Sequence, residues 1–240
     1  MTVRPPVTAV HVVVPAHDEE RLVGRCLDAL AVAARRAVDT GLRATVTLVL
    51  DACTDGTGAV AAAARLPVPL VVREVRARNV GVARAVGANS ALRASHAPLD
   101  TTWLLHTDAD SQVPPGWIVD HVALADAGAD VVVGTVRPDA ADLTAAQLLA
   151  WAGSRVPGRP NGHVHGANLG LRASRYVDAG GFAPEPLHED VLLVERLRQM
   201  PGVVVVASDV VDVLTSGRTV GRAPGGYARY LREDLVPASP

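Results

Sequence analysis

The chain has 240 residues, of which 49% are hydrophobic, 20% charged and 3% aromatic, and its formal net charge is −2. This length and composition fit one folded domain, and they exclude a disordered chain and a globally basic protein that binds nucleic acid through its charge. All 23 basic residues are arginine, which excludes phosphate loops, Schiff bases and general bases that depend on lysine.

Strand-like and helix-like segments alternate through the first 138 residues. Apolar runs predict strands at 7–14, 44–50, 70–75, 102–105 and 130–136, and helical patterns separate them at 18–38, 57–65, 78–95 and 114–127. Asp18 is the expected N-cap of the first helix. This alternation predicts an α/β fold with a largely parallel sheet, whose strands present their carboxyl ends at one ligand-binding edge.

The alternation weakens after residue 138. The pattern predicts helices at 140–154 and 189–199, a strand at 164–171 and short strands at 203–206 and 210–213. We expect a main domain at 1–215 and a tail at 216–240 that is rich in Gly, Pro and Arg. The tail is either a mobile lid whose arginines meet a leaving diphosphate, or a disordered end.

Cysteine use and hydropathy bear on the compartment. Cys26 and Cys53 form no CxxC pair, and no secretory signal or 18-residue apolar stretch is visible. These features favour a reducing, cytoplasmic setting without an integral membrane segment.

Acidic residues follow the predicted strands and begin one late helix. Asp108-Ala109-Asp110 follows a strand, where paired carboxylates hold a divalent cation against a diphosphate or simply form an Asp-rich turn. Glu189-Asp190 begins a helix, as a general base or as acids that the helix dipole favours. Arg78 precedes another helix, as part of an anion site or as a solvated side chain.

Taken together, these motifs resemble those of family 2 glycosyltransferases with the GT-A fold, of the small soluble bacterial type. The resemblance runs from about residue 9 to 200 and rests on six segments in order: 12–20, 50–57, 77–81, 108–110, 166–182 with its Gly180-Gly181-Phe182 turn, and 189–190. It implies a Rossmann-like three-layer sandwich with a mostly parallel central sheet. It also implies a metal-dependent, inverting transfer of a sugar from a nucleotide-diphosphate sugar to an acceptor hydroxyl.

The resemblance assigns roles to individual residues. The residues implied to bind the nucleotide sugar are Pro15, His17, Glu19, Asp51, Arg78 and Asp108. Asp110 with Asp108 would hold Mn²⁺ or Mg²⁺, and Asp190 would be the general base beside Glu189. Two departures are Leu50, which replaces the first acid of a usual pair, and the absence of a histidine after His188.

The sequence disfavours two other enzyme classes and leaves one alternative function open. A nicotinamide enzyme needs a glycine-rich turn after the first strand, where this chain has Pro15-Ala16-His17-Asp18-Glu19. A sugar nucleotidyltransferase normally uses lysine in its opening loop. Leu50 leaves a catalytically degenerate module that binds nucleotide sugars or a partner as the alternative. His163 and His165 are expected to share a strand face near the acceptor side.

Overall fold

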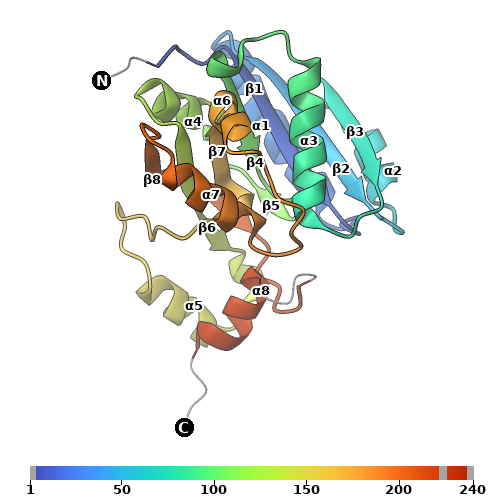
Figure 1. Ribbon diagram of the computed structural model, residues 1–240. Helices are drawn as coiled ribbons and strands as arrows, with labels where there is room; N and C mark the ends of the chain where they lie inside the picture. The colour runs from blue at the N-terminus through green and yellow to red at the C-terminus, as the bar shows by residue number, and fades with distance from the viewer. Residues whose placement is uncertain (1–3, 222–225, 237–240) are drawn as a thin grey trace.

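A computed structural model describes residues 4–221 and 226–236 (Figure 1). One eight-stranded sheet with the order β3-β2-β1-β4-β7-β6-β8-β5 forms its centre. The strands are β1 Ala9–Ala16, β2 Arg43–Asp51, β3 Leu70–Val75, β4 Thr102–His106, β5 Ser111–Gln112, β6 Val131–Pro138, β7 Leu169–Arg172 and β8 Val205–Thr215. The sheet is mostly parallel, since only β7 and the short β5 run antiparallel to their neighbours in the described part of the chain.

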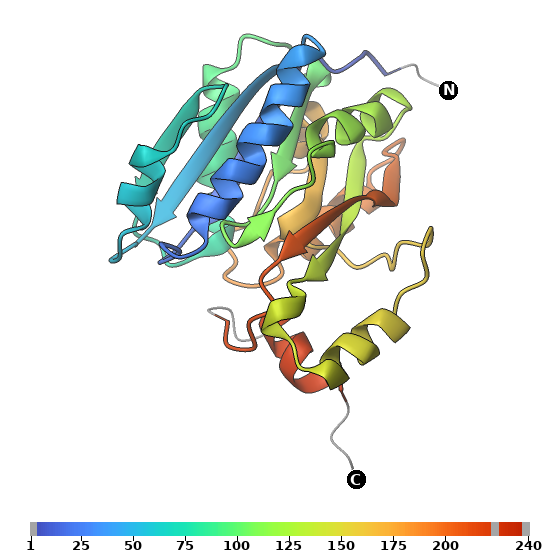
Figure 2. The same ribbon diagram turned by 180° about the vertical axis from the view of Figure 1, so that it is seen from behind.

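Helices cover both faces of the sheet, as the two opposite views show (Figures 1 and 2). One face carries α1 Val23–Asp39, α2 Thr57–Ala63 and α4 Trp117–Asp126, and the other carries α3 Val80–Ala94, α6 Ala173–Asp178 and α7 Glu189–Gln199. The remaining helices, α5 Ala145–Gly153 and α8 Tyr227–Arg229, lie side by side beyond the sheet. The expected three-layer α/β architecture is therefore confirmed.

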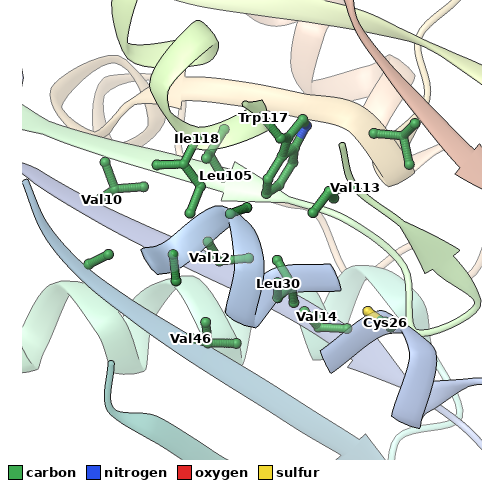
Figure 3. Packing of buried hydrophobic residues seen from close by; sticks show 14 of the residues in the cluster. Val10, Val12, Val14, Cys26, Leu30, Val46, Leu105, Val113, Trp117 and Ile118 are labelled. Atoms are coloured by element: carbon green, nitrogen blue, oxygen red, sulfur yellow. The ribbon is translucent and has the colours of Figure 1, made fainter. Parts of the chain in front are cut away.

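The central strand β1 contributes to a core on each side. Val10, Val12 and Val14 pack against the α1 face together with Leu30 (Figure 3), whereas Val13 faces the α3 and α7 side. Valine suits this position because β-branched side chains pack well on a pleated surface that is buried on both faces. The two cores hold the strand ends rigidly, which fixes the loops that follow them.

Several predicted boundaries were wrong. Asp18 is not a helix N-cap, because α1 begins only at Val23 and the Asp18 carboxylate accepts from the Thr54 N–H at 2.6 Å. The segment at 140–154 is a short 3₁₀ turn followed by α5, and the expected strand at 164–171 begins only at Leu169. The two short strands after residue 203 are one strand, β8, and the sequence pattern did not reveal β5 or α6.

The tail contains helix where a loop or mobile segment was expected. α8 continues into a π-helical turn at Tyr230–Asp234, and Gln147 Nε2 of α5 donates to the Leu231 carbonyl at 2.9 Å. Residues 222–225 and 237–240 of the tail lie outside the described residues. The division into 1–215 and 216–240 stays a prediction.

Candidate active site

Four non-glycine residues with left-handed backbones surround one edge of the sheet. Asp18 follows β1 with φ 50°, Ala52 follows β2 with φ 51°, Arg78 follows β3 with φ 49°, and His188 precedes α7 with φ 60°. Such conformations are costly without glycine, and they collect where function requires an exact loop shape. The carboxyl edge of the parallel strands is therefore the candidate active site.

Reciprocal hydrogen bonds join the loops after β1 and β2. The Asp18 and Asp55 carboxylates accept from the backbone N–H groups of Thr54 and Glu20, at 2.6 and 3.0 Å. Glu20 Oε2 accepts from the Gly56 N–H at 2.8 Å. His17 Nδ1 lies 2.5 Å from the Asp51 carbonyl oxygen. The two loops therefore form one unit that holds His17 and Glu19 at the edge.

Asp51 shapes the loop before α3. Its buried carboxylate accepts three consecutive backbone N–H groups: Ala77 at 2.7 Å and Arg78 at 2.8 Å on Oδ1, and Asn79 at 2.7 Å on Oδ2. Charge-assisted bonds of this kind are strong enough to hold Arg78 in its left-handed conformation. The Arg78 side chain itself is exposed at this turn. The sequence did not indicate this anchoring role of Asp51.

A buried arginine in α3 joins two of the predicted acids. Arg84 Nη2 lies 2.6 Å from Asp108 Oδ1 and its Nε lies 2.9 Å from Glu189 Oε1. Burial alone would lower the pKa of Arg84, but these carboxylates outweigh that effect and raise it, so the guanidinium stays charged. Gly166 makes room for it, since a Cβ there would lie 2.3 Å from Arg84 Nη2.

The two acids at the start of α7 have different surroundings. Glu189 is paired with Arg84, whereas Asp190 accepts backbone N–H groups from Gly166 at 2.5 Å and from Val191 at 2.8 Å. Burial raises the pKa of both carboxyls, and the nearby Arg84 opposes the rise. A carboxylate with a raised pKa is a stronger base, and Asp190 is the one without an arginine bonded directly to it.

A second arginine, from the tail, meets the remaining acids. Arg218 Nη2 lies 2.8 Å from Asp110 Oδ2 and 2.8 Å from Glu19 Oε1, and its Nη1 donates to Glu19 Oε2 at 3.2 Å. Five carboxylates thus gather at this edge, and Arg84 and Arg218 each bridge two of them. The sequence predicts a contact between the tail arginines and a diphosphate, but not this pairing of Arg218 with Asp110 and Glu19.

The acids near Asp110 fit a hard divalent cation. Burial first, and the neighbouring Asp108 next, raise the pKa of Asp110 to about 6 against the opposing effect of Arg218. Crowded, desolvated carboxylates of this kind are the oxygen ligands that Mg²⁺ and Mn²⁺ prefer, and a cation would relieve their repulsion. Asp108 and Asp110, with Glu19 beside them, are the residues that could hold it.

A different trio brings its ligating atoms close together. Atoms of Asp18, Cys53 and Asp55 lie within 4.8 Å of one another. However, Asp55 Oδ1 accepts both the Thr57 hydroxyl and the Thr57 N–H, and Asp18 accepts the Thr54 N–H. We attribute this trio to the structure of the loops.

The structure therefore gathers five of the predicted residues around two arginines. Arg84 pairs with Asp108 and Glu189, Arg218 pairs with Glu19 and Asp110, and Asp190 follows Glu189 in the chain. The other four predicted residues stand on neighbouring strand and loop ends: Pro15, His17, Asp51 and Arg78. The sequence analysis did not single out Arg84, although an arginine in the middle of the small-residue helix 80–94 was a usable signal. A long charged side chain among glycine and alanine has room to be buried.

Neither of the two predicted acceptor-side histidines lies on a strand. The His163 and His165 rings are 6.2 Å apart, and the His165 ring packs edge-on against Tyr227 at 5.9 Å. Burial lowers the pKa of His165 to about 4, so this ring is neutral at neutral pH. Its neighbour Gly166 bonds to Asp190.

Structures of similar architecture include several transferases. S. aureus TarS in complex with UDP-GlcNAc is 15% identical, over 91% of this chain and 61% of that chain, with a TM-score of 0.67. PcManGT, a mannosyltransferase from Pyrobaculum calidifontis in complex with GDP-Man and Mn²⁺, is 22% identical, over 89% and 58%, with a TM-score of 0.63. Glucosyl-3-phosphoglycerate synthase from Mycobacterium tuberculosis, in complex with Mg²⁺ and UDP, is 17% identical, over 94% and 77%, with a TM-score of 0.54.

These likenesses show that the fold is that of GT-A glycosyltransferases. The chain spans about three fifths of the length of the TarS and PcManGT chains. No curated protein sequence gives a match, and none of the helices within the described residues could cross a membrane. The family model of glycosyl transferase family 2 matches residues 11–168, more than half of the chain, and the chain belongs to that family.

Proposed function

We propose that the protein transfers a hexosyl group from a nucleotide-diphosphate sugar to an acceptor hydroxyl, with inversion at the anomeric carbon. The observation that carries this proposal is the connection Asp108–Arg84–Glu189. It joins the acids after β4, which suit a diphosphate and its cation, to the acids at the start of α7, which suit a general base. One buried side chain would therefore position both the residues that bind the leaving diphosphate and the residue that accepts the proton of the acceptor.

The donor would lie along the carboxyl edge of the sheet. Its base and ribose would contact the loop from Pro15 to Glu19, together with Asp51 and Asp108. Arg78 stands at the start of α3, where exposed N–H groups and a guanidinium favour a diphosphate. UDP, UDP-GlcNAc and GDP-Man are bound by the similar structures and support a donor of this class.

Asp110 and Asp108 would hold the divalent cation. When bound, a Mn²⁺ or Mg²⁺ ion neutralises the negative charge that develops on a leaving diphosphate. The similar PcManGT and glucosyl-3-phosphoglycerate synthase structures contain Mn²⁺ and Mg²⁺ respectively. The oxygen donors at this edge match the preference of either ion.

Asp190 would act as the general base. Its carboxylate would take the proton of the acceptor hydroxyl while that oxygen attacks the anomeric carbon from the side opposite the diphosphate. The Gly166 N–H bonds one carboxylate oxygen and keeps the group oriented. Glu189 would position the site through Arg84 rather than react itself.

A thermal-shift panel tests this function. UDP-GlcNAc and GDP-Man, each with and without Mn²⁺, should show which donor class stabilises the protein, because a ligand that binds only the folded state raises its stability. Asp110→Asn should lose the Mn²⁺-dependent part of the shift, whereas the exposed Asp28→Asn on α1 should retain it. Slow hydrolysis of the bound donor then distinguishes an enzyme from a module that only binds nucleotide sugars. Failure of every nucleotide sugar to stabilise the wild type would contradict the proposal.

A further inference from the structure

The end of β8 brings the tail onto the predicted metal ligands. β8 pairs with the short strand that follows Asp110, with Thr215 opposite Ser111, and the Ser111 hydroxyl donates to the Thr215 hydroxyl at 2.9 Å. The Ser216 N–H then donates to the Asp110 carbonyl oxygen at 3.2 Å. Three residues beyond Thr215, Arg218 therefore reaches the Asp110 carboxylate.

Contacts on both sides fix the backbone that carries Arg218. The Gly217 N–H donates to Asp142 Oδ2 at 2.8 Å, and a Cβ on Gly217 would lie 2.8 Å from the Asp139 carbonyl oxygen. On the other side, Arg232 Nη1 donates to the Thr219 carbonyl at 2.8 Å. These contacts on either side of Arg218 hold its guanidinium next to the Asp110 carboxylate.

The Arg218 guanidinium occupies the place between the carboxylates where a divalent cation would bind. One nitrogen, Nη2, lies 2.8 Å from both Asp110 Oδ2 and Glu19 Oε1. A divalent ion that takes the same carboxylate oxygens would displace these bonds, and two positive groups so close together repel each other strongly. The Arg218 side chain is 31% exposed, so it has an open side toward which it can move.

We propose that Arg218 and the divalent cation compete for the carboxylates of Asp110 and Glu19, so that Arg218 holds the site together until the cation enters. This inference rests on the proposed function, since it concerns the same metal ligands. Once released, the guanidinium moves toward its exposed side and is free to bond a donor diphosphate bidentately. Arg218 is then a positioning residue for the empty site and a binding residue for the loaded one.

Calorimetric titration with Mn²⁺ alone tests the competition without any need for activity. Arg218→Gln should bind Mn²⁺ at least tenfold more tightly than the wild type, because the competing charge is gone. Arg218→Lys keeps the charge and should remain near the wild type. Arg229→Gln serves as the matched control, because Arg229 lies in the same tail but pairs with the exposed Glu233.

Titration with UDP in the presence of saturating Mn²⁺ completes the test. Here Arg218→Gln should bind UDP at least fivefold more weakly than the wild type, so the two effects have opposite signs, which general misfolding does not produce. Equal or weaker Mn²⁺ binding by Arg218→Gln, beside a wild type that binds both Mn²⁺ and UDP, would overturn the competition alone. Absence of Mn²⁺ and UDP binding in the wild type would overturn the proposed function and this inference together.

Discussion

Arg84 Nη2 lies 2.6 Å from Asp108 Oδ1, although the Arg84 side chain is only 2% exposed. Its Nε bonds Glu189 as well, so one buried charge connects the proposed diphosphate side of the site to the proposed base side. Removal of one partner from a buried ion pair costs about 3–5 kcal/mol. Arg84→Met should therefore lower the free energy of unfolding by about that amount in urea denaturation.

A milder variant separates positioning from folding. Arg84→Lys keeps the charge but cannot reach both carboxylates with a planar fork. It should remain folded and yet bind UDP with Mn²⁺ at least tenfold more weakly, because Asp108 and Glu189 lose their common support. Arg93→Lys, an exposed change on the same helix, is the control. Wild-type UDP affinity in Arg84→Lys would show that the bridge does not position the site.

Substitution of Asp51 should lower stability, whereas substitution of Arg78 should weaken ligand binding. In Asp51→Asn an NH₂ group replaces one of the oxygens that accept the three backbone N–H groups at 77–79. A charge-assisted hydrogen bond of this kind contributes roughly 1.5–3 kcal/mol, so this variant should be destabilised by at least about 2 kcal/mol. Arg78→Ala should leave stability unchanged, since the side chain is exposed, but should weaken UDP binding more than uridine binding. Thermal unfolding and calorimetry give both readouts, and equal losses for UDP and uridine would place Arg78 outside the diphosphate site.

The sheet and the acidic motifs were predictable because they are local in sequence. Valine-rich runs specify buried parallel strands, and Asp108-Ala109-Asp110 and Glu189-Asp190 each follow an element boundary that composition makes visible. For Asp51 the sequence predicts a contact with the nucleotide sugar but not the anchoring role, because its bonds to the amides at 77–79 join it to a loop 26 to 28 residues away.

The two bridging arginines depend on contacts that a single sequence does not display. Arg84 meets Glu189 across 105 positions, and Arg218 meets Glu19 across 199. The pairing of β8 with β5 that delivers Arg218 was itself missed, because two residues are too few for a periodic pattern. The wrong N-cap assignment for Asp18 has the same origin, since its partner Thr54 belongs to the next strand's loop.

Asp110 should make the metal-free protein less stable as the pH rises. Burial first, and Asp108 next, raise the pKa of this carboxyl to about 6 from 3.8. The folded state therefore binds the proton more tightly than the unfolded state, and stability is lost as the pH rises from about 4 through 6. A difference of about two pKa units corresponds to about 3 kcal/mol of stability. A substitution of Asp110 would recover less than this amount, because it also removes the ion pair with Arg218.

Asp110→Asn removes the unfavourable ionisation of this buried carboxyl. The variant should therefore raise the stability of the metal-free protein by about 1–2 kcal/mol at pH 8. The gain should vanish near pH 4, where the wild-type carboxyl is protonated. Denaturation in urea at pH 4, 6 and 8 measures this dependence, with the exposed Asp28→Asn as control. A gain in Asp110→Asn that is the same at pH 4 and pH 8 would contradict the assigned cause.

Asp130 should matter for stability without affecting the site. Its carboxylate is fully buried before β6, at the opposite edge of the sheet, where Arg4 donates to Oδ1 at 2.8 Å and to Oδ2 at 2.6 Å. Asp130→Asn leaves these arginine bonds without a compensating charge and should cost about 3–5 kcal/mol. UDP affinity below the melting transition should stay within twofold of the wild type. A large loss of UDP binding in the folded variant would mean that the two edges of the sheet are coupled.

The acids at the start of α7 allow a direct test of the base. Asp190 bonds the Gly166 N–H, whereas Glu189 is committed to Arg84. A positioned base contributes about 10²–10⁴ in rate. Asp190→Asn should therefore bind UDP with Mn²⁺ near normally and yet turn over its donor at least a hundredfold more slowly, because the interaction is made mainly in the transition state. Glu189→Gln should show a smaller loss of turnover together with reduced stability, because Arg84 loses a partner.

Burial raises the pKa of Asp190, so wild-type turnover should fall as the pH drops through a value above that of an ordinary aspartate, and Asp190→Asn should lack this dependence. Donor hydrolysis followed against pH measures turnover and its pH dependence, calorimetry measures UDP affinity, and urea denaturation measures the stability of Glu189→Gln. Severe loss in Glu189→Gln with near-normal turnover in Asp190→Asn would reverse the two roles.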